Sequence, residues 1–444
     1  MKTQVKNYLI SNHTNMKNLK TIITLFILVM IAACSKDSDE TAAAATPLLA
    51  ITAINPATGP KNTPVTISGT GFSTTLGNNA VTLNGKVCPV VNSTATQLTI
   101  TIPPSAGSGK IKVAVAAANA ESGNFEFVVT TTVTTIAGSS QGLLDGQGFA
   151  AQFNFLRGIT LDTQGNLLIA DGDRIRKVSS NGLVTTIAGS TGGFLDGQGI
   201  LAKFDGVTGI VITATGAIHV TERFNHKIRV INNTGIVSNF AGTIRGFSDG
   251  NRFFAAFNIP NGIVIDASGN TFVADSFNRR IRKIAGDNVT TFSGNSNSAS
   301  TDGQGVSASF EFPRGLSIDN SGNLYVTDDF ILIRKITPTG LVTTIAGSTS
   351  GFADGQGTAA RFNNATGIVA DSEGNLFVTD GSKIRKITSN GLVTTLAGTA
   401  TKGFVDGNAD IAQFNNLDGI TIDSQGNLYV ADTGNFKIRK ITFD

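Results

Sequence analysis

Six acidic residues and six arginines recur at equivalent places in the sequence, and together they could form a catalytic or metal-binding ring. The acids are Asp171, Glu222, Asp275, Asp328, Asp380 and Asp432. The arginines follow the acids by five to seven residues and are Arg176, Arg229, Arg282, Arg334, Arg385 and Arg439. Six carboxylates without cations would repel one another, and every acid here has an arginine nearby. We therefore expect structural ion pairs in place of a catalytic ring.

Residues that differ between equivalent places are better candidates for a ligand site, because an asymmetric ligand needs an asymmetric surface. One such residue precedes a glycine that recurs in every repeat: Arg157, Thr208, Asn261, Arg314, Thr366 and Asp418. At the centre of a ring of repeats, on the face with the long loops, these side chains would form a binding mouth. A solvated rim is the alternative interpretation. Two arginines can hold an anionic or hydroxyl-rich group bidentately, which favours an acidic sugar or another carboxylate as ligand.

The second repeat contains both histidines that follow residue 47. His219 takes a place where the other repeats have Leu, Phe or Tyr, so we expect it in the core. His226 lies in the polar loop "ERFNHK", and we expect it near the mouth as a further ligand contact. The pattern of histidines and carboxylates does not match a metal site, and no metal or cofactor is expected.

The elements that carry these residues repeat at a pitch of about 52 residues. "VTTIAG" at residue 133 returns unchanged at 184 and 342, and variants occur at 237, 289 and 393. One unit reads as four short strands over 158–162, 166–171, 174–178 and 184–189, with a tight turn at Asp162 and Gly165. Four-stranded units at a pitch of this size are typical of the blades of a β-propeller.

Counting strands predicts a six-bladed propeller over residues 131–444. The last unit supplies three strands, so we expect residues 133–138 to pair with residues 437–441 and to close the ring. An Asp-Gly pair recurs in the connection between units, and Asp145 is expected to cap a short helix over residues 147–153.

Residues 47–130 read as six or seven short strands with period-two alternation, a pattern typical of a small antiparallel sandwich. Cys88 lies in the stretch "GKVCPVV" of this region. We expect it to be a small buried apolar residue without a disulfide partner.

The N-terminal residues read as a targeting segment. Residues 1–33 are expected to be a signal peptide, because lysines precede a 13-residue apolar run from Thr21 to Ala33. "IAAC" resembles the lipobox of bacterial lipoproteins, which implies that Cys34 is lipidated. Residues 34–46 read as a flexible tether, and the acidic residues after Cys34 resemble a surface-export signal of Gram-negative lipoproteins. The expected location is the cell surface, on the outer membrane, held by the N-terminal lipid alone.

Two resemblances extend this reading. "INPATGPKNTPVTISGTGF" resembles the opening of an IPT/TIG domain, an immunoglobulin-like module that usually acts as a spacer. "GITIDSQGNLYVADTGNFKIRKI" resembles the NHL repeat, which implies a six-bladed propeller. Members of the NHL family range from binding scaffolds to a few lyases and hydrolases, so the fold leaves the function open.

We therefore expect a non-catalytic lipoprotein, a monomer, whose loop face binds a glycan or a protein. The alternative is a lyase or lactone hydrolase with a metal-dependent site in the channel. Asn261 and Asp418 could contribute to such a site, but an equivalent inner-strand Glu is lacking. With 34 basic and 31 acidic residues and no basic block in the folded part, nucleic acid is not an expected partner.

Overall fold

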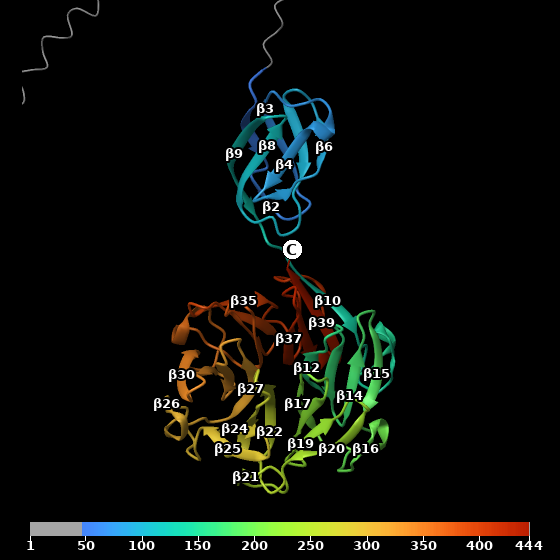
Figure 1. Ribbon diagram of the computed structural model, residues 1–444, viewed down its shortest axis with the longest axis vertical. Helices are drawn as coiled ribbons and strands as arrows, with labels where there is room; N and C mark the ends of the chain where they lie inside the picture. The colour runs from blue at the N-terminus through green and yellow to red at the C-terminus, as the bar shows by residue number, and fades with distance from the viewer. Residues whose placement is uncertain (1–46, 444) are drawn as a thin grey trace, which may run out of the picture.

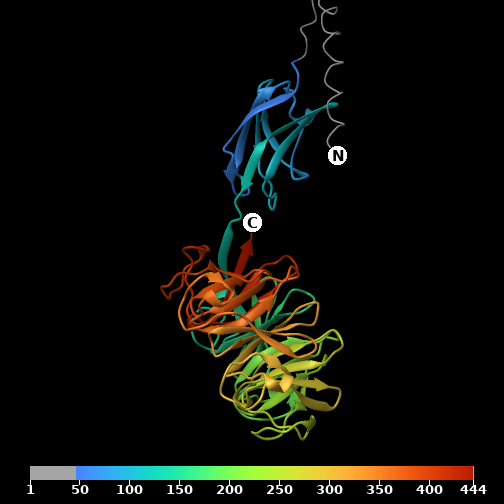
Figure 2. The same ribbon diagram turned by 90° about the vertical axis from the view of Figure 1, so that its left-hand side faces the viewer.

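The computed structural model describes residues 47–443, which fold into strands and short 3₁₀ helices (Figure 1). No α-helix occurs within these residues, and the predicted all-β class is confirmed. Two groups of sheets follow one another along the chain. Figure 2 shows them connected by the segment between β9 (Ala118–Phe127) and β10 (Thr131–Ala137).

The first group consists of two sheets around one apolar core. One sheet has the order β1 (Ala50–Asn55), β3 (Pro64–Thr70), β7 (Gln97–Thr101), β6 (Val90–Ser93). The other has the order β2 (Thr58–Gly59), β9, β8 (Gly109–Val115), β4 (Asn79–Leu83), β5 (Lys86–Val87). A 3₁₀ helix, η1 (Leu76–Asn78), precedes β4.

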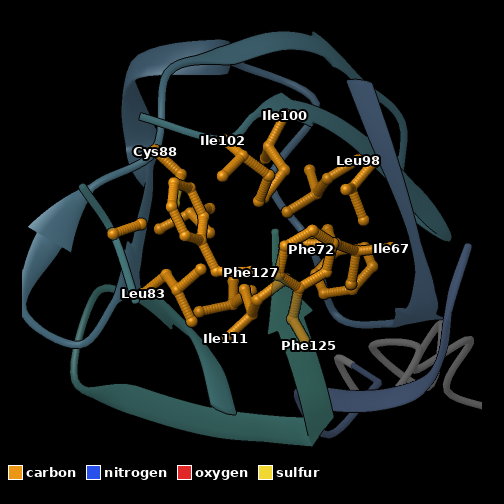
Figure 3. Close-up of a cluster of buried hydrophobic side chains, with 14 of the residues drawn as sticks. Ile67, Phe72, Leu83, Cys88, Leu98, Ile100, Ile102, Ile111, Phe125 and Phe127 are labelled. Carbon is orange, nitrogen blue, oxygen red and sulfur yellow. The ribbon is translucent and has the colours of Figure 1, made fainter. Parts of the chain in front are cut away.

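The core of this group follows the period-two alternation of its strands. Val65 and Ile67 of β3 are fully buried, and they lie opposite Ile100 and Leu98 of β7. Cys88 is part of the same cluster (Figure 3), so its predicted buried position is confirmed. Burial raises the pKa of its thiol to about 11, which leaves the sulfur protonated and unreactive at neutral pH.

The second group consists of six five-stranded sheets, which we number 1 to 6 in chain order. Sheet 1 has the order β11 (Gly146–Gln147), β15 (Leu183–Ala188), β14 (Arg174–Val178), β13 (Leu167–Asp171), β12 (Leu156–Leu161). Sheet 2 has the order β16 (Gly197–Gln198), β20 (Ile236–Ala241), β19 (Lys227–Ile231), β18 (Ile218–Glu222), β17 (Val207–Ile212). Sheet 3 has the order β21 (Gly250–Asn251), β25 (Asn288–Ser293), β24 (Arg280–Ala285), β23 (Thr271–Asp275), β22 (Pro260–Ile265).

The remaining three sheets repeat this order. Sheet 4 comprises β26 (Gly303–Gln304), β30 (Leu341–Ala346), β29 (Leu332–Ile336), β28 (Leu324–Asp328), β27 (Pro313–Ile318). Sheet 5 comprises β31 (Gly355–Gln356), β35 (Leu392–Ala397), β34 (Lys383–Ile387), β33 (Leu376–Asp380), β32 (Ala365–Ala370). Sheet 6 comprises β36 (Gly407–Asn408), β10, β39 (Lys437–Phe443), β38 (Leu428–Asp432), β37 (Leu417–Ile422).

Sheet 6 contains a strand from the beginning of the second group. β10 lies between β36 and β39, with Val133 opposite Ile441. In each sheet we call the innermost strand the first strand and its neighbour the second strand. Around the group, each first strand contacts that of the next sheet, in the order β12, β17, β22, β27, β32 and β37, and β37 contacts β12 (Figure 1). The six sheets thus surround a common centre.

The predicted turn between the first two strands of a sheet is confirmed. The Asp162 carboxylate accepts hydrogen bonds from the backbone N–H groups of Gln164 and Asn166, and Gly165 has a φ of 79°. A side-chain cap and a residue without Cβ therefore fix the turn locally.

The predicted helix over residues 147–153 is wrong. Residues 146–147 pair with β15 as a fifth, outermost strand, and only η2 (Gly148–Ala150) follows. Asp145 does not cap η2; its carboxylate accepts hydrogen bonds from the N–H of Thr186 and from Arg176. Equivalent 3₁₀ turns are η3 (Gly199–Leu201), η5 (Gly305–Ser307) and η6 (Gly357–Ala359), and two others, η4 (Ser276–Asn278) and η7 (Thr433–Asn435), follow second strands.

The first strands pack backbone to backbone, because each contains a glycine at the contact. A Cβ on Gly262 would lie 2.3 Å from the carbonyl oxygen of Arg314 in the next sheet. The same holds for Gly419, whose Cβ would lie 2.2 Å from the oxygen of Arg157. No side chain fits at such distances, so these glycines bring the residues just before them together around a narrow centre.

Candidate functional site

The six acid–arginine pairs are buried within single sheets. Each arginine donates to the acid of the preceding strand at 2.7–3.1 Å, and both side chains are almost fully buried. Each also bonds the aspartate of the recurring Asp-Gly pair, as Arg176 does with Asp145. The prediction that these pairs are structural is confirmed, because every acid is occupied by its arginine and by backbone N–H groups.

Three residues of the predicted mouth meet at the centre of the ring. Arg157 Nη1 lies 3.2 Å from Asp418 Oδ2, and Arg314 Nη2 lies 2.8 Å from the same oxygen. They come from the starts of β12, β27 and β37, so Asp418 holds together three different sheets. The side chains retain 18–21% of their exposure and line a cavity of about 90 Å³. The site is thus small, charged and open to solvent.

A third arginine, Arg223, is near enough to interact electrostatically with Arg157, Arg314 and Asp418, and it is not among the site residues predicted from the sequence. It follows β18, whose last residue pairs with Val207 beside the mouth. Burial lowers the pKa of its guanidinium, with further lowering from the nearby charges of Arg157 and Arg314. Its Nε is buried without a hydrogen-bond partner in the structure. The sequence indicates Arg223 only through its place in "ERFNHK", the polar loop that also contains His226.

Each mouth arginine is backed by an aromatic ring. The guanidinium carbons lie 4.9–5.8 Å from ring centroids in three pairs: Arg157 with Phe155, Arg223 with Phe224, and Arg314 with Phe330. Cation–π contact of this kind restrains the arginines without using their hydrogen-bond donors. Three guanidinium groups around one carboxylate leave the mouth with an excess of two positive charges.

The other three predicted mouth residues make hydrogen bonds within the ring. The hydroxyl of Thr208 bonds the carbonyl of Pro260, and that of Thr366 bonds the carbonyl of Leu417, each in the next sheet. The amide of Asn261 donates to Ser276 Oγ at 2.7 Å. All three side chains are buried, and their residues border the same cavity as Arg157, Arg314 and Asp418. Their contact with a ligand therefore stays a prediction.

The two histidines of the ring differ in their surroundings. His226 Nδ1 accepts a hydrogen bond from the N–H of Ile259 at 3.1 Å, which joins the loops of sheets 2 and 3. Burial lowers its pKa, as do the charges of Arg245 and Lys227. This hydrogen bond is to the backbone and does not test the expected contact of His226 with a ligand at the rim. That contact stays a prediction. His219 is in the core as predicted, with its ring 4.2 Å from that of Phe240.

The burial of His219 predicts a pH effect on stability. Burial lowers its pKa to about 4 in the folded state. Between pH 6.5 and 4 the unfolded chain binds a proton at this residue that the folded chain does not, so stability falls as pH falls through this window. Phe occupies the equivalent places 272 and 377, and His219→Phe should remove the effect. We expect the stability difference between variant and wild type to grow by about 2–3 kcal/mol from pH 7 to pH 4.

Chemical unfolding at several pH values tests this. His226 titrates in both proteins and cancels in the difference. A difference that stays constant from pH 7 to pH 4 would contradict the assignment of His219 as a buried neutral residue.

Within residues 47–443, no three His, Cys, Asp or Glu side chains lie together as a metal site requires. The same residues contain no helix with the length and hydropathy of a membrane span. Cys34 and the predicted signal peptide lie outside the described residues.

Comparison with known families defines the class of protein. Residues 49–129 match the IPT/TIG domain, and residues 414–441 match the NHL repeat. Residues 110–198 match the Teneurin NHL domain. The chain therefore combines an IPT/TIG domain with NHL-type sequence on an all-β, propeller-like fold.

Particular relatives cover short parts of the chain. One is SUPPRESSOR OF QUENCHING 1, a chloroplastic protein of Arabidopsis thaliana, 37% identical over 91 residues, which are 20% of this chain and 9% of that protein. Another is Teneurin-1 of Gallus gallus, 47% identical over 47 residues, which are 11% of this chain and 2% of that protein. The chain thus spans a small part of either relative.

Solved structures resemble the chain over most of its length. A protein of unknown function from Bacteroides thetaiotaomicron has a TM-score of 0.59 at 21% identity, covering 93% of this chain and all of that one. An auxiliary nutrient binding protein from Bacteroides ovatus has a TM-score of 0.59 at 19% identity, over 90% and 98% of the two chains. A second such protein, from B. thetaiotaomicron, has a TM-score of 0.57 at 18% identity, over 89% and 98%. At these identities the likeness concerns the fold.

Proposed function

We propose that residues 131–444 form a six-bladed β-propeller closed by β10, and that residues 47–130 form an IPT/TIG domain acting as a spacer. β10 takes the place in sheet 6 that β15 takes in sheet 1. Thr135 donates to Asp406 as Thr186 donates to Asp145. The contact between β37 and β12 completes the circuit of first strands, which supports a closed ring.

We further propose that the propeller binds an anionic group of a ligand at its mouth, as part of a non-catalytic binding protein. The observation that carries this proposal is the pair of arginines, Arg157 and Arg314, that both bond Asp418, with the charge of Arg223 nearby. Asp418 neutralises one charge and holds Arg157 and Arg314 in place. Each of these two guanidinium groups bonds Asp418 through one nitrogen, so other N–H groups remain to bind a carboxylate bidentately.

A glycan with an acidic sugar fits this site better than a protein. The cavity of about 90 Å³ admits a single small group, such as a carboxylate, and not a strand or helix. The similarity in fold to the auxiliary nutrient binding proteins agrees with a binding role. A metal-dependent lyase or hydrolase is disfavoured at Asp418, because a cation there would lie against two guanidinium groups.

Paired substitutions test the mouth. We expect Arg157→Gln with Arg314→Gln to abolish retention of acidic oligosaccharides on a glycan array. This double change alone would leave the Asp418 carboxylate without both of its partners and would lower stability. Adding Asp418→Asn removes that unpaired charge, and the cost of losing these half-buried pairs should be about 1 kcal/mol or less.

The chain offers a matched control for this experiment. Arg252 forms a comparable, partly exposed pair with Asp287, at 2.7 Å and away from the mouth. The combined change Arg252→Gln and Asp287→Asn should leave binding unchanged. Normal glycan binding by the variant with Arg157→Gln, Arg314→Gln and Asp418→Asn would contradict the proposed binding site.

We propose that the protein is anchored by lipid on Cys34 and extends from the outer membrane through the tether at residues 34–46. The support is the run of 13 apolar residues before "IAAC" in the sequence. Cys34→Ser should give an unprocessed precursor, or release the protein from membranes, as measured by fractionation and N-terminal mass. Unchanged membrane retention and unchanged N-terminal mass in that variant would contradict the anchor.

A further inference from the structure

A groove lined by three phenylalanines lies next to the mouth, between sheets 3 and 4. It has a volume of about 370 Å³ and is bordered by Phe277 of η4, by Phe312 before β27, and by Phe330 after β28. The rings of Phe277 and Phe312 meet edge to face with centroids 5.5 Å apart. Phe312 and Phe330 stack at 5.6 Å. Phe277 is 47% exposed, so the groove presents aromatic surface to solvent.

Phe330 of the groove contacts Arg314 of the mouth. The guanidinium carbon of Arg314 lies 5.4 Å from the centroid of this ring. A ligand that reaches Arg314 therefore lies within one side chain of the aromatic surface.

The groove departs from the pattern that the sheets share. Four of the six sheets have Gly, Ile or Asn where sheet 4 has Phe312. Asp329 and Phe330 are successive non-glycine residues in the left-handed region, with φ of 52° and 62°. Such conformations cost about 1–3 kcal/mol each and persist where the surroundings hold them. The equivalent connections have a single left-handed residue, such as Arg279 or Phe436, so the ring does not require two in succession.

Two acids, Glu311 and Asp329, are among the polar residues that line the groove. Glu311 bonds Ser298 and lies 3.7 Å from Arg279. Burial raises the pKa of Asp329, and the charge of Glu311 adds to this shift. Among the described residues, the Asp329 carboxylate has no side-chain hydrogen bond or ion pair, so it can accept hydrogen bonds from a ligand.

We propose that this groove binds a neutral sugar ring, and that the ligand of the protein is a glycan in which this ring neighbours an acidic sugar held at the mouth. The inference rests on the proposed function of the mouth. Aromatic faces match the C–H face of a sugar, and carboxylates accept hydrogen bonds from its hydroxyl groups. The groove has two acids and one arginine, whereas the mouth has three arginines and one acid. The opposite charges place the acidic sugar at the mouth and exclude it from the groove.

The test uses an array of immobilised neutral and uronate-bearing oligosaccharides. Wild type should retain uronate-bearing glycans that also contain neutral sugars. Phe277→Ala should weaken binding to those glycans about tenfold, the size expected for loss of one aromatic contact. Phe277→Leu keeps an apolar side chain but removes the aromatic face, and it should weaken binding similarly. Phe254→Ala is the control, since Phe254 is 78% exposed and follows the outermost strand of sheet 3.

Salt dependence separates the two subsites. Binding by the Phe277 variants should fall with ionic strength as steeply as in wild type, because the charges of the mouth remain. If the arginine variants lose binding while both Phe277 variants keep the affinity of wild type, the proposed sugar site in the groove is wrong and the proposed site at the mouth still holds. Wild type that retains no glycan would overturn both proposals.

Discussion

Val133→Asp is expected to destabilise the repeat region by about 3 kcal/mol or more, because it places a charge in a fully buried position. Val133 precedes all other strands of the ring in sequence, yet it lies opposite Ile441 and packs in the core of sheet 6. Its equivalent in sheet 1 is Val184, opposite Val178. If β10 closes the ring, Val184→Asp should cost as much as Val133→Asp.

Thr134→Asp is the control on the same strand, because Thr134 is exposed. Calorimetry of the variants measures the effect, with the transition of the first group of sheets as an internal reference. Deleting residues 131–138 should go further and abolish cooperative unfolding of the ring, since β39 would become an open edge. A Val133→Asp variant as stable as Thr134→Asp would show that β10 is not part of the ring.

Arg282→Met is expected to have the second large effect, a loss of about 3–5 kcal/mol in the free energy of unfolding. The Arg282 guanidinium bonds Asp275 at 2.7 Å and Asp249 at 2.6 Å, and it also bonds the carbonyls of Ala256 and Ser248. Methionine fills part of the volume but leaves the fully buried Asp275 without its cation.

The neighbouring Arg280 provides the matched control. It lies on the same strand, over the ring of Phe247 at 4.0 Å, and donates only to the carbonyl of Asn278. Arg280→Met should therefore cost about 1 kcal/mol or less. Equal losses in the two variants would contradict the view that the buried pair holds the sheet together.

Features that repeat along the chain could be predicted from the sequence. The turn at Asp162 and Gly165 depends on five adjacent residues, so its chemistry is local. The acid–arginine pairs lie on adjacent antiparallel strands, and their separation of five to seven residues suffices to bring them together. His219 could be placed in the core because Phe and Tyr occupy the same register elsewhere.

Features that depend on contacts between sheets could not be predicted from the sequence. Arg223 approaches Arg157 and Arg314 only because the ring curves around a narrow centre. Thr208 and Thr366 turn to carbonyls of the next sheet, a choice set by the distance between first strands that glycine allows. The helix expected over residues 147–153 does not form, because Gln147 belongs to the outer strand β11 and only the short η2 follows it.

The most direct test of the mouth is a crystal structure of the protein soaked with the uronate-bearing oligosaccharide that binds best on the array. The sugar carboxylate should lie within hydrogen-bond distance of both Arg157 and Arg314, with Arg223 facing it. A ligand bound at the opposite face, beside turns such as that of Asp162 and Gly165, would contradict the account.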